Sequence, residues 1–102
     1  MRMMLVGAGA VGESIVKVMQ WRDPKGMWLE YVLVCDYDKS RAQEVVDKLH
    51  GDARFEAEKV NATDREDMKN LIRTHKIDFV MDAAPPFASN MIFDAAFATG
   101  VN

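Results

Sequence analysis

Three glycines fall within six residues near the start of this sequence, and their setting restricts what the chain can fold into. The hexapeptide Gly7-Ala8-Gly9-Ala10-Val11-Gly12 directly follows a short apolar run, residues 2–6. Beyond Gly9, residues of a predicted buried helix face recur at spacings of three and four, namely Val11, Gly12, Ile15, Val18 and Met19. The pattern therefore predicts a buried strand that passes through a tight glycine turn straight into a helix.

The rest of the chain repeats this alternation of apolar runs and helical patterns. Strands are expected at residues 2–6, 31–35, 53–60 and 77–81, the third alternating with charged residues as an edge strand does. Helices are expected from Gly9 to the Pro/Gly break at 22–26, at 42–49, from a capping box at 63–66, and over 90–99. Because strands that alternate with helices form parallel sheets with right-handed crossovers, the chain is predicted to be α/β. We expect a Rossmann-type, doubly wound sheet with strand order 3-2-1-4.

Size and charge limit the kind of molecule further. With 102 residues, the chain is long enough for one domain, spanning 1–102. Its net charge of -3, with both signs interspersed, argues against nucleic acid or an anionic membrane as partner. No apolar run approaches the ~20 residues that span a bilayer. The single Cys35 cannot form an internal disulfide, which favours a reducing, cytoplasmic location.

The glycine turn carries a chemical prediction when it is combined with Asp36. In the strand–turn–helix setting of G-x-G-x-x-G, Gly7 allows the tight turn, Gly9 lets a pyrophosphate approach the backbone, and Gly12 lets helix and strand pack closely. The helix N-terminus then offers N–H groups to the phosphates. Asp36 ends the second strand, 24 residues after Gly12, where a carboxylate accepts hydrogen bonds from the adenosine ribose. The sequence therefore predicts a dinucleotide site that prefers NAD, since a carboxylate repels the 2′-phosphate of NADP.

Two neighbouring features leave alternatives open. Lys39 and Arg41 follow Asp36 and could pair with a 2′-phosphate, so NADP is possible, or they could form a solvated first turn of the next helix. Residues 82–87, Asp-Ala-Ala-Pro-Pro-Phe, end the fourth strand near the point where such sheets bind ligands. This segment is either part of the cofactor site or a stiff connector.

The same residues resemble a known family. Gly7 to Gly12, Asp36 and, most narrowly, Ala83-Ala84-Pro85-Pro86-Phe87 are similar to the N-terminal cofactor domain of saccharopine dehydrogenases and their relatives, lysine 6-dehydrogenase and the carboxynorspermidine-forming enzymes. The resemblance runs through nearly the whole chain and implies an oxidoreductase of lysine or related metabolism.

The resemblance also implies roles for particular residues. Ala10 and Val11 would contact the pyrophosphate, Asp36 the adenosine ribose, and Asn61 with Ala62 the adenine. Similar proteins often carry an acidic residue where Asn61 stands. Ala84 and Pro85 would lie near the nicotinamide ribose.

Groups that would carry out a reaction are not evident in the sequence. No residue stands out as a catalytic acid, base or nucleophile, and His50 and His75 lack companions at metal-ligand spacing. A sheet that stopped before its fifth strand would expose residues 79–81 on an open edge, so we expect a fragment of a longer chain whose substrate domain is absent. The domain alone is then expected to be inactive. The full protein is expected to be a homo-oligomer acting on an amino-acid-derived C–N bond; the alternative is a nucleotide-sensing regulatory domain of a transport system.

Overall fold

A computed structural model of the chain describes residues 1–83. The strands are β1 (Arg2–Val6), β2 (Tyr31–Asp36), β3 (Phe55–Lys59) and β4 (Phe79–Asp82), and the helices are α1 (Ala10–Arg22), α2 (Lys39–Asp47) and α3 (Arg65–Thr74). The expected strands and helices of this part of the chain are all present. The helix expected over 90–99 and the loop beyond Ala83 lie outside the described residues.

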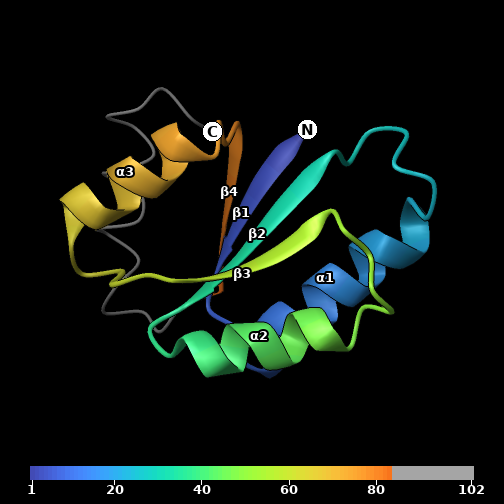
Figure 1. The fold of residues 1–102 in the computed structure, drawn as a ribbon, viewed down its shortest axis with the longest axis horizontal. Helices are drawn as coiled ribbons and strands as arrows, with labels where there is room; N and C mark the ends of the chain where they lie inside the picture. The colour runs from blue at the N-terminus through green and yellow to red at the C-terminus, as the bar shows by residue number, and fades with distance from the viewer. Residues whose placement is uncertain (84–102) are drawn as a thin grey trace.

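The strands form one parallel sheet in the order β3-β2-β1-β4, which confirms the predicted fold class and strand order. In Figure 1 the helices α1 and α2 lie on one face of this sheet and α3 on the other. The chain moves from β1 outward to β2 and β3, then returns to place β4 on the other side of β1. The carboxyl ends of β1 and β4 therefore meet at the reversal point, where doubly wound sheets bind their ligands.

Alternation along the two central strands divides the core into two layers. In β1, Met3 and Leu5 pack toward α1 and α2, whereas Met4 and Val6 pack toward α3. Buried residues of β2 alternate in the same way, with Val32 and Val34 on the face covered by α1 and α2, and Leu33 and Cys35 on the face covered by α3. Because both faces are covered, the buried residues of these strands are apolar on both faces, without the polar alternation of an amphipathic strand. The fully buried Cys35 behaves as a small apolar side chain, and burial raises the pKa of its thiol.

The buried face of α1 is narrower than the spacing of its apolar residues predicts. Gly12 and Val16 are its fully buried residues, whereas Val11 is 65% exposed and Val18 50% exposed. Each of these two valines lies more than a quarter-turn around the helix from Gly12, so neither can face the sheet. The expected stripe that included Val11 and Val18 is therefore wrong at those two positions.

The N-terminal ends of α2 and α3 are both fixed by aspartates. Asp38 caps α2, and its carboxylate accepts a hydrogen bond from the Ser40 N–H. In α3 the cap is Asp64, which accepts from the Glu66 and Asp67 N–H groups, so the capping box starting at Thr63 is wrong by one residue. Asp64 rather than Thr63 caps α3, because the Thr63 hydroxyl already donates to Asn61 Oδ1 at 2.6 Å in the preceding turn.

A polar network holds the loop between α1 and β2 at the end of the sheet remote from the glycine turn. Asp23 is 3% exposed, and its carboxylate accepts hydrogen bonds from the N–H groups of residues 27, 28 and 29. Arg54 donates to the Asp23 and Leu29 carbonyls and forms a two-nitrogen ion pair with Asp52. Five backbone groups of the loop are thereby hydrogen-bonded to side chains in the absence of regular secondary structure.

Candidate dinucleotide-binding site

The glycine turn joins β1 to α1 in a conformation that requires glycine at two positions. Gly7 has φ of 105°, a backbone conformation that side chains other than glycine rarely adopt. A Cβ at Gly12 would lie 2.0 Å from the Gly7 carbonyl oxygen and 3.3 Å from Leu5 Cδ2. Gly12 therefore lets α1 approach the turn and β1 at backbone distance, as the sequence predicted.

Gly9 stands in a more open place than the other two glycines. Its φ of -79° is available to any residue, and a Cβ built on it would meet only Arg41 Nη2, at 3.7 Å. Gly9 caps α1 without any side-chain hydrogen bond to the first turn of the helix. The first-turn N–H groups that follow it, from Ala10 onward, therefore have no capping side chain in the described structure. Such a helix start fits an anionic group, because its N–H groups and the helix dipole both favour negative charge.

Asp36 is the acidic residue that the glycine turn requires nearby, and the fold brings the two into contact. The Ala8 N–H donates to Asp36 Oδ2 at 2.8 Å, and the Asp38 N–H donates to Oδ1 at 2.9 Å. The Gly7 N–H also donates to the Cys35 carbonyl at 2.8 Å. The carboxylate is thus fixed between the glycine turn and the start of α2. Each of its oxygens has a second lone pair with which to accept a ligand hydroxyl.

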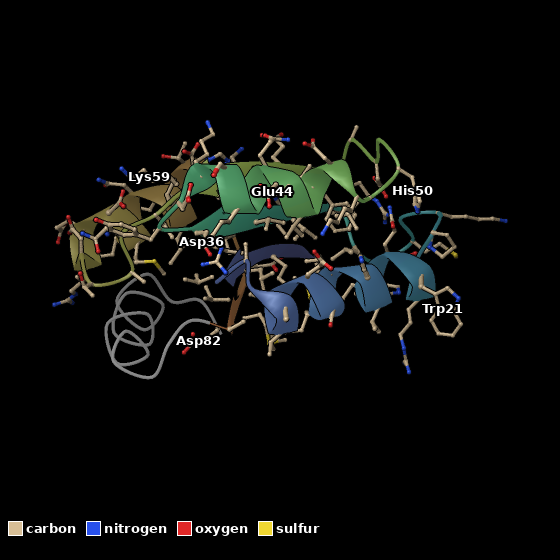
Figure 2. All side chains as sticks on the ribbon, turned by 90° about the horizontal axis from the view of Figure 1, so that it is seen from below. Trp21, Asp36, Glu44, His50, Lys59 and Asp82 are labelled. Atoms are coloured by element: carbon tan, nitrogen blue, oxygen red, sulfur yellow. The ribbon has the colours of Figure 1, made fainter. Side chains whose placement is uncertain are left out.

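Cations lie beside this carboxylate on two elements. Arg41 in the first turn of α2 reaches over Gly9, as its 3.7 Å approach to a Cβ built there shows. Lys59, the last residue of β3, is the register partner of Asp36. Figure 2 shows Asp36 and Lys59 toward the same end of the molecule, with Trp21 and His50 toward the opposite end. Lys39 is exposed at the start of α2.

The turn after β3 contains the residues expected to lie near adenine. The Asn61 carbonyl oxygen Oδ1 accepts hydrogen bonds from the Thr63 N–H at 3.1 Å and from the Thr63 hydroxyl. Its backbone N–H donates to Asp67 Oδ2 at 2.9 Å. The backbone N–H and the side-chain oxygen of Asn61 therefore both form hydrogen bonds that stabilise the turn. Its side-chain NH₂ remains as the group that could donate to a ligand. Ala62 is half-buried against the α3 face of the core.

The end of β4 meets the glycine turn directly. Asp82 is the register partner of Val6, and the Ala83 N–H donates to the Val6 carbonyl at 2.8 Å. Ala83, the last described residue, therefore lies beside the end of β1 from which the glycine turn starts. Ala84 and Pro85, which the family resemblance places near the nicotinamide ribose, lie outside the described residues.

Among residues 1–83, no three His, Cys, Asp or Glu side chains are grouped so that they could hold a metal ion. None of the helices α1 to α3 is long and apolar enough to cross a membrane.

Several contacts at this edge could not be read from the sequence. The bond from Ala8 to Asp36 uses a backbone N–H, which no residue pattern marks. Tyr37 is 72% exposed beside the site, and its only signal in the sequence is that an aromatic residue directly follows the acidic strand end. The approach of Arg41 to Gly9 joins two segments whose distance depends on how α1 and α2 pack.

The parallel sheet, the glycine turn and the acidic end of β2 define a Rossmann-type dinucleotide-binding domain. Residues 3–102 match the model of the saccharopine dehydrogenase NADP-binding domain family, so the chain belongs to that family, as its resemblance predicted. Membership of this family supports a nicotinamide dinucleotide as the class of cofactor.

Known relatives agree with this placement. Carboxynorspermidine synthase of Vibrio cholerae serotype O1 is 26% identical over 110 aligned positions, which cover 100% of this chain and 26% of that protein. Apo saccharopine dehydrogenase (L-Glu forming) of Saccharomyces cerevisiae has a similar fold, with a TM-score of 0.76 at 16% identity, over 98% of this chain and 20% of that one. The dTDP-glucose 4,6-dehydratase DesIV of Streptomyces venezuelae, solved with NAD bound, also has a TM-score of 0.76, at 15% identity over 99% of this chain and 37% of that one.

The relatives that match this chain are much longer than it is. The chain spans about a quarter of the curated relative and a fifth of the saccharopine dehydrogenase. The named relatives are a synthase, a dehydrogenase and a dehydratase with NAD bound, and none of them is a transport-regulating sensor.

Proposed function

We propose that this chain is the cofactor domain of a saccharopine dehydrogenase-like oxidoreductase that acts on an amino-acid-derived C–N bond. The observation that carries the proposal is the hydrogen bond from the Ala8 N–H to Asp36 Oδ2, because it joins the glycine turn to the acidic residue at one edge of the sheet. A strand–glycine turn–helix without that partner would be a much weaker indication of a dinucleotide.

Different residues at this end of the sheet would bind different parts of the cofactor. The N–H groups of Ala10 and Val11 would hold the pyrophosphate, which approaches over Gly9, while Gly7 and Gly12 shape the turn. Asp36 would accept the hydroxyls of the adenosine ribose, and the Asn61 NH₂, beside Ala62, would donate to a ring nitrogen of adenine. Ala84 and Pro85 would border the nicotinamide ribose. The bound nicotinamide supplies hydride chemistry, for which these residues provide position and electrostatics.

Direct binding tests this assignment. The chain should bind NADH measurably in a calorimetric titration, and ADP-ribose should compete for the same site. Asp36→Ala should weaken both ligands, since it removes the ribose acceptor and the partner of the Ala8 N–H. Trp21→Ala is the matched control, because Trp21 is 78% exposed at the opposite end of the molecule. Failure of the unmodified chain to bind either ligand would contradict the proposed function.

We further propose that NAD is preferred over NADP. The Asp36 carboxylate is held in place by two backbone N–H groups, so a 2′-phosphate would meet a fixed negative charge. Asp36→Ser should shift the preference toward NADP, because it removes this repulsion while Lys39 and Arg41 remain. A change of about 1.4 kcal/mol would be tenfold in relative affinity. Competition binding with both cofactors measures it; tighter NADP binding by the unmodified chain would show that Arg41 or Lys39 binds the phosphate.

The remaining features of the proposed enzyme concern the full-length protein. We propose a cytoplasmic homo-oligomer in which the groups that bind the amino-acid substrate lie outside residues 1–102. The buried thiol of Cys35 is consistent with a reducing compartment.

A further inference from the structure

We propose that an exposed apolar patch at the end of α1 is the surface through which two copies of this chain associate. Four side chains make up this tryptophan patch: Val18, Trp21, Met27 and Trp28. The inference rests on the homo-oligomer of the proposed function and adds the surface that forms it. The residues assigned to the cofactor take no part in it.

The amount of apolar surface is the first argument. Trp21 is 78% exposed and Met27 85% exposed, and about half of Val18 and of Trp28 is exposed. Together the four residues expose on the order of 600 Å², as much as the largest apolar patches of typical monomers, which are often functional. A specific, stable interface buries about 800 Å² on each partner. With the charged residues around it, the tryptophan patch is therefore large enough for one half of a dimer interface.

The loop that carries part of the patch is fixed in place before any partner binds. The Asp23 carboxylate, directly after α1, accepts hydrogen bonds from the Met27 N–H at 2.8 Å and the Trp28 N–H at 3.0 Å. These bonds bring both residues back to the end of the helix that carries Trp21. Arg54 in turn donates to the Asp23 carbonyl at 2.8 Å. A surface that is already ordered loses less conformational entropy when a partner covers it.

Charged residues around the patch indicate which partner it fits. Three exposed charged residues alternate with the apolar ones along the chain, the cations Arg22 and Lys25 and the anion Glu30. Because both signs are present beside indole rings that attract cations, the same patch on a second copy offers a partner for each group. Such self-complementarity is what a two-fold interface requires. An anionic membrane or an acidic peptide would match the cations but would be repelled by Glu30.

The place of the patch leaves it accessible in a longer protein. The proposed substrate-binding groups must face the nicotinamide, at the carboxyl ends of β1 and β4. Figure 2 shows Trp21 at the opposite end of the molecule from Asp36, which ends β2. A second copy can therefore cover the patch while substrate and cofactor enter at the other end.

Both tryptophans of the chain belong to the patch, so their fluorescence reports on it without a label. Sedimentation velocity of the 102-residue chain over a dilution series should show a monomer–dimer equilibrium. The emission should shift to longer wavelength as the dimer dissociates. Trp21→Ser should raise the dissociation constant more than about tenfold, as loss of an interface hot spot does. Tyr37→Ser is the matched control, because it removes an exposed ring next to Asp36, at the opposite end.

An exchange of charge tests whether the partner is the same patch of a second copy. The double variant Arg22→Glu, Lys25→Glu has only acidic residues around the patch, and Glu30→Lys has only basic ones. Each variant alone should be monomeric, because like charges meet across the two-fold axis. An equimolar mixture of the two should dimerise. All variants should bind NADH as the unmodified chain does, since the substitutions lie away from the cofactor residues.

Three results would overturn the dimer surface. They are an unmodified chain that stays monomeric at every concentration, a dimer that survives Trp21→Ser, and a mixture of the two charge variants that does not associate. A shift of the emission to shorter wavelength on vesicles containing phosphatidylserine would assign the patch to a membrane instead. Thermal unfolding checks that each variant is folded. Failure to bind NADH would contradict the proposed cofactor domain and leave the dimer measurable, so the two failures are distinguishable.

Discussion

The glycines of the turn differ in their surroundings, so substitutions at Gly9 and at Gly12 should have different consequences. A side chain at Gly9 would contact only Arg41 Nη2, at an ordinary distance, and its φ of -79° suits any residue. Gly9→Val should therefore fold like the unmodified chain but lose NADH binding, because its γ-methyls occupy the approach of the pyrophosphate. Thermal unfolding and calorimetric titration measure the two effects separately, and undiminished NADH binding would refute the role of Gly9.

Substitution at Gly12 should instead damage the fold. A Cβ there would lie 2.0 Å from the Gly7 carbonyl oxygen, which is backbone and cannot turn aside. Gly12→Ala should lower the free energy of unfolding by about 3 kcal/mol, as overpacking does. Gly51→Ala is the control, because nothing lies within 4 Å of that Cβ and only its φ of 72° opposes it, at about 1–2 kcal/mol. Chemical denaturation of the three proteins compares them; equal stability of Gly12→Ala and the unmodified chain would contradict the packing.

How far single residues could be predicted depends on what fixes them. The separate roles of Gly7 and Gly12, and the placement of Asp36 at the end of β2, followed from spacing, because the turn and the strand end are local features. The bond between Ala8 and Asp36 depends on two parallel strands in register, which spacing alone does not give. Tyr37 was missed because exposure is a property of the folded surface.

Helix capping gives a prediction at the scale of the element. Asp64 accepts hydrogen bonds from two N–H groups of the first turn of α3, whereas the Thr63 hydroxyl serves the preceding turn. Asp64→Ala should therefore cost about 1 kcal/mol of stability through loss of the cap. Thr63→Ala leaves the cap in place and should cost clearly less. Urea denaturation of both variants decides between them, and a larger loss for Thr63→Ala would restore the capping box that the sequence favoured.

The loop between α1 and β2 should make stability depend on pH. The hydrogen bonds from the Arg54 guanidinium lower the pKa of Asp52 from 3.8 to about 2. Because the pKa is lower in the folded protein, the stabilisation is complete above about pH 4 and is lost as the pH falls toward 2. It amounts to about 2 kcal/mol.

Asp52→Asn is the variant that tests this pH dependence. Its deficit in the free energy of unfolding should be largest at pH 7 and should shrink between pH 4 and pH 2, as the unmodified chain loses its own ion pair. Urea denaturation across this range measures both proteins. A deficit that stayed constant down to pH 2 would contradict the assigned role of the Asp52–Arg54 pair.

The strands and helices could be predicted where the hydrophobic pattern was strong, whereas their first and last residues were predicted less well. The apolar runs of β1 and β2 placed both strands to within a residue, because both faces are buried. α2 begins three residues earlier than its apolar positions suggest, since Asp38 caps it and its first turn is exposed. The two buried residues of α1 could not be separated from Val11 and Val18 by spacing alone, because the glycine at 12 lets the helix lie close to the sheet along a narrow line.

For the molecule as a whole, the prediction concerns activity. The described residues include the end of the sheet at which we propose that the cofactor binds. The sequence marked none of them as a proton-transfer group for catalysis. We therefore expect the purified 102-residue chain to bind cofactor without catalysing its reduction by saccharopine, lysine or similar amines. Absorbance at the wavelength of NADH, with the full-length protein as positive control, measures this. Steady cofactor reduction by the chain alone would contradict it.

The place of β4 beside β1 also sets an order on the events of folding. β1 reaches β2 through residues 7–30 but reaches β4 only after residues 7–78, roughly three times as much chain. The entropy of closing the longer loop adds about 1 kcal/mol, so β1, β2 and β3 should assemble before β4 joins them. The end of the sheet at which we propose that the nucleotide binds includes the junction of β1 and β4, so it is the last part to form. On a ribosome, most of these residues must be synthesised before a cofactor can find any site to occupy.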